Sequence, residues 1–120
     1  MYFEYPVQPR QGATWNPTID VCERAQEIVI FVEMPGVNRS DVQLTWHDGV
    51  LIISGQKRQM PPDAGGATYF CVERTYGPFR REITINVGVD FKQARAELKD
   101  GLMKIHLPKA QREAVDIPIL

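Results

Sequence analysis

Apolar and polar residues alternate along most of the chain, in short runs separated by turn residues. Residues 18–22 alternate, and residues 28–32 form a β-branched run that is long enough for a buried strand. Val42, Leu44 and Trp46 are spaced by two, so they share one face of a strand. This pattern predicts one strand after another from Trp15 onward.

Two Asp-Gly pairs, at 48–49 and 100–101, predict tight hairpins because both residues tolerate positive φ. The first pair leads into the apolar run 50–53. Residues 93–99 favour a helix by composition, yet they run into the second pair and then into the alternating run 102–107. A second hairpin therefore fits better than a helix.

Pro and Gly residues mark the other breaks, at 34–36 and 77–78. A long connection spans 56–67, a strand-like piece covers 68–74, and residues 79–87 alternate again. The total is about eight short strands with no long helical pattern, which is typical of an antiparallel sandwich or barrel.

The composition describes an ordinary globular chain of 120 residues with room for one domain. Its 14 basic and 15 acidic residues give a net charge of −1 and are scattered, which argues against a nucleic-acid partner. No apolar stretch is long enough to span a membrane, and the first residues do not resemble a signal peptide. Cys22 and Cys71 are therefore interpreted as reduced thiols of a cytoplasmic protein.

The chain carries no recognisable catalytic chemistry. It lacks a Gly-rich phosphate loop, so no nucleotide cofactor is expected. His47 and His106 have no metal-ligand spacing, and we expect both to be solvent-exposed surface residues and no metal to be bound. Ser40 and Ser54 lack an activating partner. Asp41 and Asp48 suit turns at the ends of strands. We therefore expect no enzymatic activity.

The polar tail of the chain ends in exposed apolar residues, Ile117-Pro118-Ile119-Leu120. Pro118 favours an extended backbone, in which Ile117 and Ile119 face the same way. The two isoleucines would then form a two-pronged plug for a hydrophobic groove. The alternative is that the tail packs as a last strand on its own sandwich.

Two strands provide a candidate acceptor for that plug. Val42, Leu44 and Trp46 on one, and Ala96 and Leu98 on the other, form spaced apolar faces. If both strands lie at sheet edges, they would form a groove suited to an added strand. The alternative is that these side chains fill the core of their own sandwich.

The connection from Gln56 to Gly77 is longer than a sandwich needs, and such connections are usually functional. A strand-like piece within it must pair with something, since unpaired strand edges invite aggregation. Pairing with another subunit is one solution.

Four motifs follow one another along the chain: residues 33–37 with 41–42, residues 46–55, residues 96–109 and the I-x-I tail 117–119. In this order and spacing they resemble the small heat-shock proteins built on the α-crystallin domain, of the bacterial and plant type. The resemblance covers residues 15–120. The late hairpin resembles the A-x-x-x-x-G-V-L signature, with Leu102 and Met103 where Val and Leu are usual.

The resemblance implies an all-β, immunoglobulin-like antiparallel β-sandwich whose long loop carries a strand swapped between the two subunits of a dimer. Here that strand would be residues 68–74, and Arg81 would pair with Glu73 of the partner. The alternative for Arg81 is an exposed strand charge of little energetic value. The dimer interface implied in this way comprises Tyr69, Phe70, Val72, Glu73 and Arg81.

The resemblance also implies a function, that of an ATP-independent holdase that keeps partly unfolded client proteins from aggregating and assembles from homodimers into larger oligomers. It divides the chain into a short arm (1–14), an α-crystallin domain (15–109) and a C-terminal extension (110–120). Residues 1–13 show no period and are expected to be flexible. The arm is much shorter than is usual in the family, and its candidate client-binding residues are Tyr2, Phe3, Tyr5 and Trp15.

Two other classes compete with this interpretation. A co-chaperone-like interaction module uses a similar sandwich, but such domains typically lack the swapped loop and the I-x-I tail. A secreted carbohydrate-binding sandwich would need a signal peptide and a clustered aromatic face. Neither rival fits the four motifs.

Overall fold

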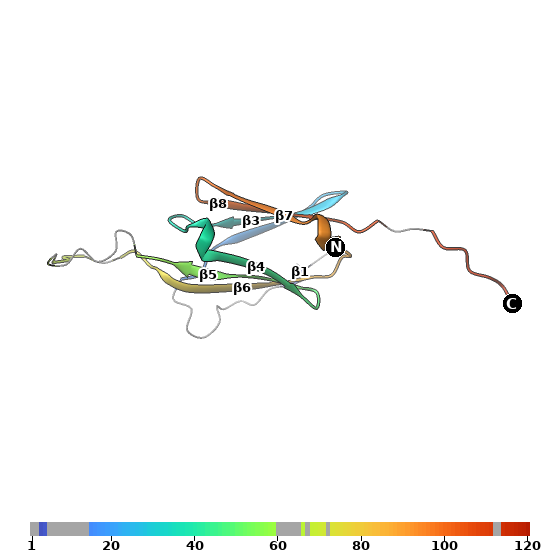
Figure 1. The fold of residues 1–120 in the computed structure, drawn as a ribbon, viewed down its shortest axis with the longest axis horizontal. Coiled ribbons are helices and arrows are strands. Elements are labelled where there is room, and N and C mark those ends of the chain that lie inside the picture. Colours follow the sequence, from blue (N-terminus) through green and yellow to red (C-terminus); the bar gives the residue numbers. More distant parts are fainter. Residues whose placement is uncertain (1–2, 5–14, 60–65, 67, 72, 112–113) are drawn as a thin grey trace.

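The computed structural model describes residues 3–4, 15–59, 66, 68–71, 73–111 and 114–120. Within these residues the chain folds into two four-stranded antiparallel sheets stacked as a sandwich (Figure 1). One sheet has the order β1-β6-β5-β4 and the other β2-β3-β8-β7. The strands are β1 (Phe3–Glu4), β2 (Ile19–Glu23), β3 (Glu27–Glu33), β4 (Val42–His47), β5 (Val50–Lys57), β6 (Gly77–Ile85), β7 (Arg95–Lys99) and β8 (Leu102–Pro108). The predicted all-β sandwich is confirmed.

Both Asp-Gly hairpins form as the sequence predicts. Asp48 and Gly49 have φ of 49° and 79°, and Asp100 and Gly101 have φ of 54° and 75°. These positive angles suit a two-residue hairpin turn, because its twist matches that of the flanking strands. His47 therefore pairs with Val50, and Lys99 with Leu102. The segment with helix-favouring composition becomes β7, preceded by a single 3-10 turn, η2 (Phe91–Gln93).

The core lies between the sheets and is built from the inward face of each strand. On β3, Ile28, Ile30 and Val32 are fully buried, and β5 and β6 oppose them with Ile53 and Ile83. Because side chains alternate along a strand, one face of each sheet supplies this apolar layer. The central strands β3, β8, β5 and β6 carry most of it, and the edge strands β2, β4 and β7 contribute partly buried side chains.

Two local expectations differ from the structure. Phe3–Glu4, expected within a flexible arm, pairs with β6 opposite Ile85 and Thr84. The described residues between Thr68 and Arg74 belong to no strand in this single chain, and Val72 lies outside the described residues. A strand that pairs only with a second copy would have no partner here, so the swapped pairing stays a prediction.

Gly55 allows the segment before β4 to lie close to β5. A short 3-10 turn, η1 (Arg39–Asp41), precedes β4, and Val42 is paired with Gly55. A Cβ atom on Gly55 would overlap the carbonyl oxygen of Asp41 and lie 2.9 Å from Cζ of Phe79. The absence of a side chain at Gly55 thus sets the position of η1 against the sheet.

We predict that Gly55→Ala lowers the free energy of unfolding by about 1–3 kcal/mol, because backbone and core must shift to admit one methyl group. Urea denaturation followed by tryptophan fluorescence measures the change. Gly88→Ala is the matched control, since its added Cβ would lie 3.6 Å from the Cβ of Ala110, an ordinary contact. The control should stay within about 0.5 kcal/mol of the wild type. Equal effects of the two substitutions would contradict the close approach at Gly55.

Candidate functional site

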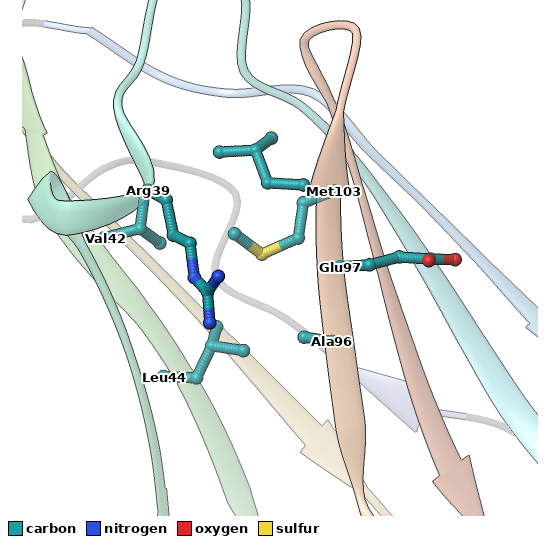
Figure 2. A pocket seen from close by; sticks show the side chains of 7 residues that line it. Arg39, Val42, Leu44, Ala96, Glu97 and Met103 are labelled. Carbon is teal, nitrogen blue, oxygen red and sulfur yellow. The ribbon is translucent and has the colours of Figure 1, made fainter.

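A groove runs between the edge strands β4 and β7, where the two sheets are not joined. It consists of two adjoining hollows that share Leu44 and Ala96. The first has a volume of about 330 Å³ and is lined by Arg39, Val42, Leu44, Ala96, Glu97, Leu98 and Met103 (Figure 2). The second has a volume of about 240 Å³, and its lining includes Trp46, Phe91, Ala94 and Arg95. We call the two hollows together the edge groove.

All five residues predicted from the sequence to accept the tail line the edge groove. Val42, Leu44 and Trp46 are half-buried on one face of β4, and Leu98 is half-buried on β7, while Ala96 is exposed. The four half-buried side chains pack against the margin of the core without being enclosed by it. The alternative that they fill the core holds only in part, because the sides of these residues that face the groove remain accessible to solvent.

An aromatic stack closes one end of the edge groove. The rings of Trp46 and Phe91 lie 3.6 Å apart between centroids, with 25° between their planes. The side chain of Asp90 accepts hydrogen bonds from the backbone N–H of Lys92 (3.1 Å) and from Nε2 of Gln93 (3.0 Å), which orders the turn that carries Phe91. Sequence reasoning missed Phe91, although Asp90 just before it was a capping signal.

A bidentate ion pair lies at the other end of the edge groove, beside η1. Nε and Nη2 of Arg58 each donate to a carboxylate oxygen of Asp41 at 2.9 Å. These hydrogen bonds, reinforced by the positive charge of Arg58, lower the pKa of the Asp41 carboxyl group. Asp41 lies in the short turn η1 as expected, and it also binds Arg58, 17 residues away on the long connection.

Figure 2 shows the charged residues of the first hollow. Arg39 extends from η1 toward Leu44, along the groove, whereas Glu97 points away from it. Ala96 and Leu98 face the groove, and strand alternation turns Glu97 and Lys99 to the opposite face of β7. Arg95, at the start of the strand, lines the second hollow. The charged side chain that lies over the first hollow is therefore that of Arg39, which is positive.

Arg81 lies inward on β6 and is only 8% exposed. Its Nη1 donates a hydrogen bond of 2.6 Å to the carbonyl oxygen of Pro17. The alternative that Arg81 is an exposed strand charge is wrong. Its pairing with Glu73 of a partner stays a prediction, and Glu73 is exposed on the long connection.

The other residues predicted for the dimer interface and the arm differ in how exposed they are. Tyr69 and Phe70 are exposed on the long connection. Trp15 packs edge-on against Phe79, with ring centroids 5.1 Å apart and Nζ of Lys57 4.6 Å from the Trp15 ring. Trp15 is thus part of the domain rather than of a free arm, and its role in client binding stays a prediction. Two arm residues, Tyr2 and Tyr5, lie outside the described residues.

The tail leaves the sandwich from an anchored root. The backbone N–H of Lys109 donates to the carbonyl of Gln26, and that of Ala110 to the carbonyl of Gly88, both at 2.9 Å. Beyond the root, residues 114–120 belong to no strand and extend away from the sheets (Figure 1). Ile117 and Ile119 are 84% and 98% exposed. The alternative that the tail adds a last strand to its own sandwich is wrong for this chain.

The histidines and cysteines lie apart from the edge groove lining. His47 is 77% exposed as expected, but His106 is only 19% exposed and its Nδ1 lies 3.2 Å from Oε1 of Glu27. His106 lies on the outward face of β8 as expected, but neighbouring side chains on the sheet cover most of it. Cys22 and Cys71 are exposed and free. The part of the chain that the structure describes contains no cluster of His, Cys, Asp or Glu suited to a metal ion.

None of the helical turns in the described ranges has the length and apolar character needed to cross a membrane.

Comparison with known proteins places these features in a family. The Hsp20/alpha crystallin family matches residues 20–119. Small heat shock protein C4 of Rickettsia felis is 32% identical over 92% of this chain and 66% of its own length. Heat shock protein 16 of Schizosaccharomyces pombe is 35% identical over 81% of this chain and 68% of its own length. Across the relatives compared, the chain spans between 51% and 71% of their length.

Solved structures share the fold over most of the chain. Heat shock protein 16.0 from Schizosaccharomyces pombe superposes with a TM-score of 0.73 and 31% identity, covering 88% of this chain and 97% of that one. A small heat-shock protein from Xylella fastidiosa gives a TM-score of 0.76 at 26% identity, covering 89% and 98%. That protein is described as having a distinct high order structure.

We predict that Asp41→Asn destabilises the fold at pH 7 and that the difference from the wild type disappears in acid. The pKa of Asp41 is lower in the folded state than its unfolded value of about 3.9, so the carboxylate stabilises the fold above that pH. The contribution is lost as pH falls through the folded-state pKa. Urea midpoints measured from pH 7 to pH 3 test this.

Asp48→Asn is the control for that series, because Asp48 is exposed beside His47 in the hairpin turn. It should change the midpoint little at neutral pH. A difference between Asp41→Asn and wild type that stays constant down to pH 3 would show that the ion pair with Arg58 contributes no stability.

Proposed function

The chain belongs to the Hsp20/alpha crystallin family, and we propose that it acts as an ATP-independent holdase that binds partly unfolded proteins and prevents their aggregation. Family membership supports a chaperone role. The observation that carries the finer proposal is the coexistence of an open apolar groove and an exposed apolar tail in one chain.

The physical basis of holding is the burial of apolar surface. Partial unfolding exposes apolar side chains of a client, and transferring them from water to an apolar surface is favourable by about 25 cal/mol per Å². The edge groove has apolar walls from Val42, Leu44 and Leu98. An extended client segment can lie in such a groove as an added strand. Holding of this kind needs no nucleotide, because mass action alone keeps bound clients apart.

The proposed assembly uses the tail of one subunit as the occupant of the edge groove of another. Ile117 and Ile119 share one face of an extended segment, and the two hollows lie side by side along β4. Burying both isoleucines is worth roughly 1.5–3 kcal/mol for each side chain. Their exposure in the single chain supports a role between subunits.

The proposed building block of that assembly is a dimer. The segment 68–74 of each subunit would pair with β2 of its partner, since β2 is bonded on one side only, to β3. Phe70 and Tyr69, exposed in the single chain, would then gain contacts. Both thiols are free, which supports a reducing compartment such as the cytoplasm.

The first test is light scattering of a heat-labile client in nucleotide-free buffer, with and without the full chain. We expect suppression of aggregation near stoichiometric ratios, because each bound client requires its own apolar surface. Added ATP should not change the result. A folded protein that leaves the client aggregating would favour an interaction module of the co-chaperone kind instead.

The second test removes the tail anchors. We predict that deletion of residues 117–120, or the milder Ile117→Ala with Ile119→Ala, reduces the assembly to dimers in size-exclusion chromatography with light scattering. Loss of two buried isoleucines weakens each tail contact by about a hundred- to ten-thousandfold. Gln111→Ala at the exposed root is the control and should leave the mass unchanged. An assembly of unaltered mass after the deletion would rule out the linking role of the tail.

A further inference from the structure

Arg39 is the charged side chain that lies over the apolar surface of the first hollow. It projects from η1 toward Leu44, while Glu97 on the opposite wall points away (Figure 2). Arg39 is exposed, and it lines the first hollow at the end nearest η1. An occupant that enters this end therefore meets a positive charge before it meets the apolar walls.

The guanidinium of Arg39 has no anionic partner within the described ranges of the chain. The carboxylate nearest in sequence, Asp41, already receives two hydrogen bonds from Arg58. That bidentate pair occupies both oxygens of Asp41. Among the described residues, therefore, no carboxylate competes with a group that an occupant brings to Arg39.

The tail carries one charged side chain among residues 114–120, and it is negative. Asp116 directly precedes Ile117 and is exposed. In an extended tail, Ile117 and Ile119 point into the groove while Asp116 points back over its rim. A long arginine side chain that starts on the rim is well suited to reach such a carboxylate.

We propose that Asp116 of a second copy pairs with Arg39 and thereby sets the direction in which the tail lies in the edge groove. This inference rests on the tail docking proposed above. It places Ile117 in the first hollow, beside Val42 and Leu98, and Ile119 in the second, beside Trp46. The tail then runs from η1 toward the aromatic stack at Phe91.

The spacing between Asp116 and the two isoleucines distinguishes this direction of the tail from its reverse. An extended chain advances about 3.3 Å per residue, so Asp116 falls next to the first hollow when Ile117 occupies it. In the reverse direction Ile119 occupies the first hollow, and Asp116 is about 10 Å farther along, at the end lined by Arg95. The two isoleucines can occupy the two hollows in either direction of the tail. A charge pair can therefore determine which direction is favoured.

A charge-swap experiment on the full chain tests the pair. The concentration at which the assembly dissociates is measured at low ionic strength by light scattering. Asp116→Arg or Arg39→Asp should each weaken the tail contact about two- to fivefold, as expected for an exposed ion pair. The double variant should return close to the wild-type value, and all differences should vanish in about 1 M salt.

Three further variants make each outcome decisive. Asp116→Arg combined with Arg95→Asp should not restore assembly; restoration there would mean the reverse direction and overturn the proposal. Ile117→Ala with Ile119→Ala should dissociate the assembly. If that variant dissociates while Asp116→Arg has no effect, the charge pair is refuted and tail docking stands. If neither variant changes the assembly, tail docking itself fails.

The direction has its own readout in a Cys22→Ser, Cys71→Ser background. With Leu120→Cys in the tail, oxidation should cross-link two copies through Thr45→Cys, which lies by the second hollow. The same tail should not cross-link through Ser40→Cys in η1. Cross-linking at position 40 and not at position 45 would contradict the proposed direction.

Discussion

The burial of one face of each sheet against the other is the constraint on which the rest of the structure depends. Side chains alternate along every strand, so each sheet has a single apolar layer, and the central strands enclose Ile28, Ile30, Ile53 and Ile83 completely. A sandwich of two open sheets cannot cover its own edges. The apolar faces of β4 and β7 consequently remain half-covered, and the edge groove is the result.

Local polar contacts determine the two ends of that groove. The Arg58–Asp41 pair and the close approach at Gly55 hold η1 against β5, and Asp90 orders the turn that carries Phe91. These contacts are small in number, yet they set where the apolar surface begins and ends. The groove of this Hsp20/alpha crystallin family member is therefore a product of both the sandwich and the short turns beside it.

The strand pattern and both hairpins were predictable from the sequence because their causes are local. Period-two alternation and positive-φ turn residues act over a few residues, and they correctly overrode the helix-favouring composition of residues 93–99. The same alternation placed the five residues that line the edge groove, and their role as acceptor of the tail stays a prediction. The burial of Arg81 against the carbonyl of Pro17 and the cover over His106 were missed, since both arise from residues far away in the chain.

The sequence by itself determined which side chains share a face and where the chain turns, and it marked the apolar tail. Only the tertiary structure decided that β4 and β7 are edge strands, that Asp41 is held by Arg58, and that Arg39 rather than Glu97 leans over the groove. The physical reason is the distance along the sequence over which each interaction acts. Alternation is a property of a few neighbouring residues, whereas an edge, an ion pair or the direction of a side chain depends on which distant strands come to lie together.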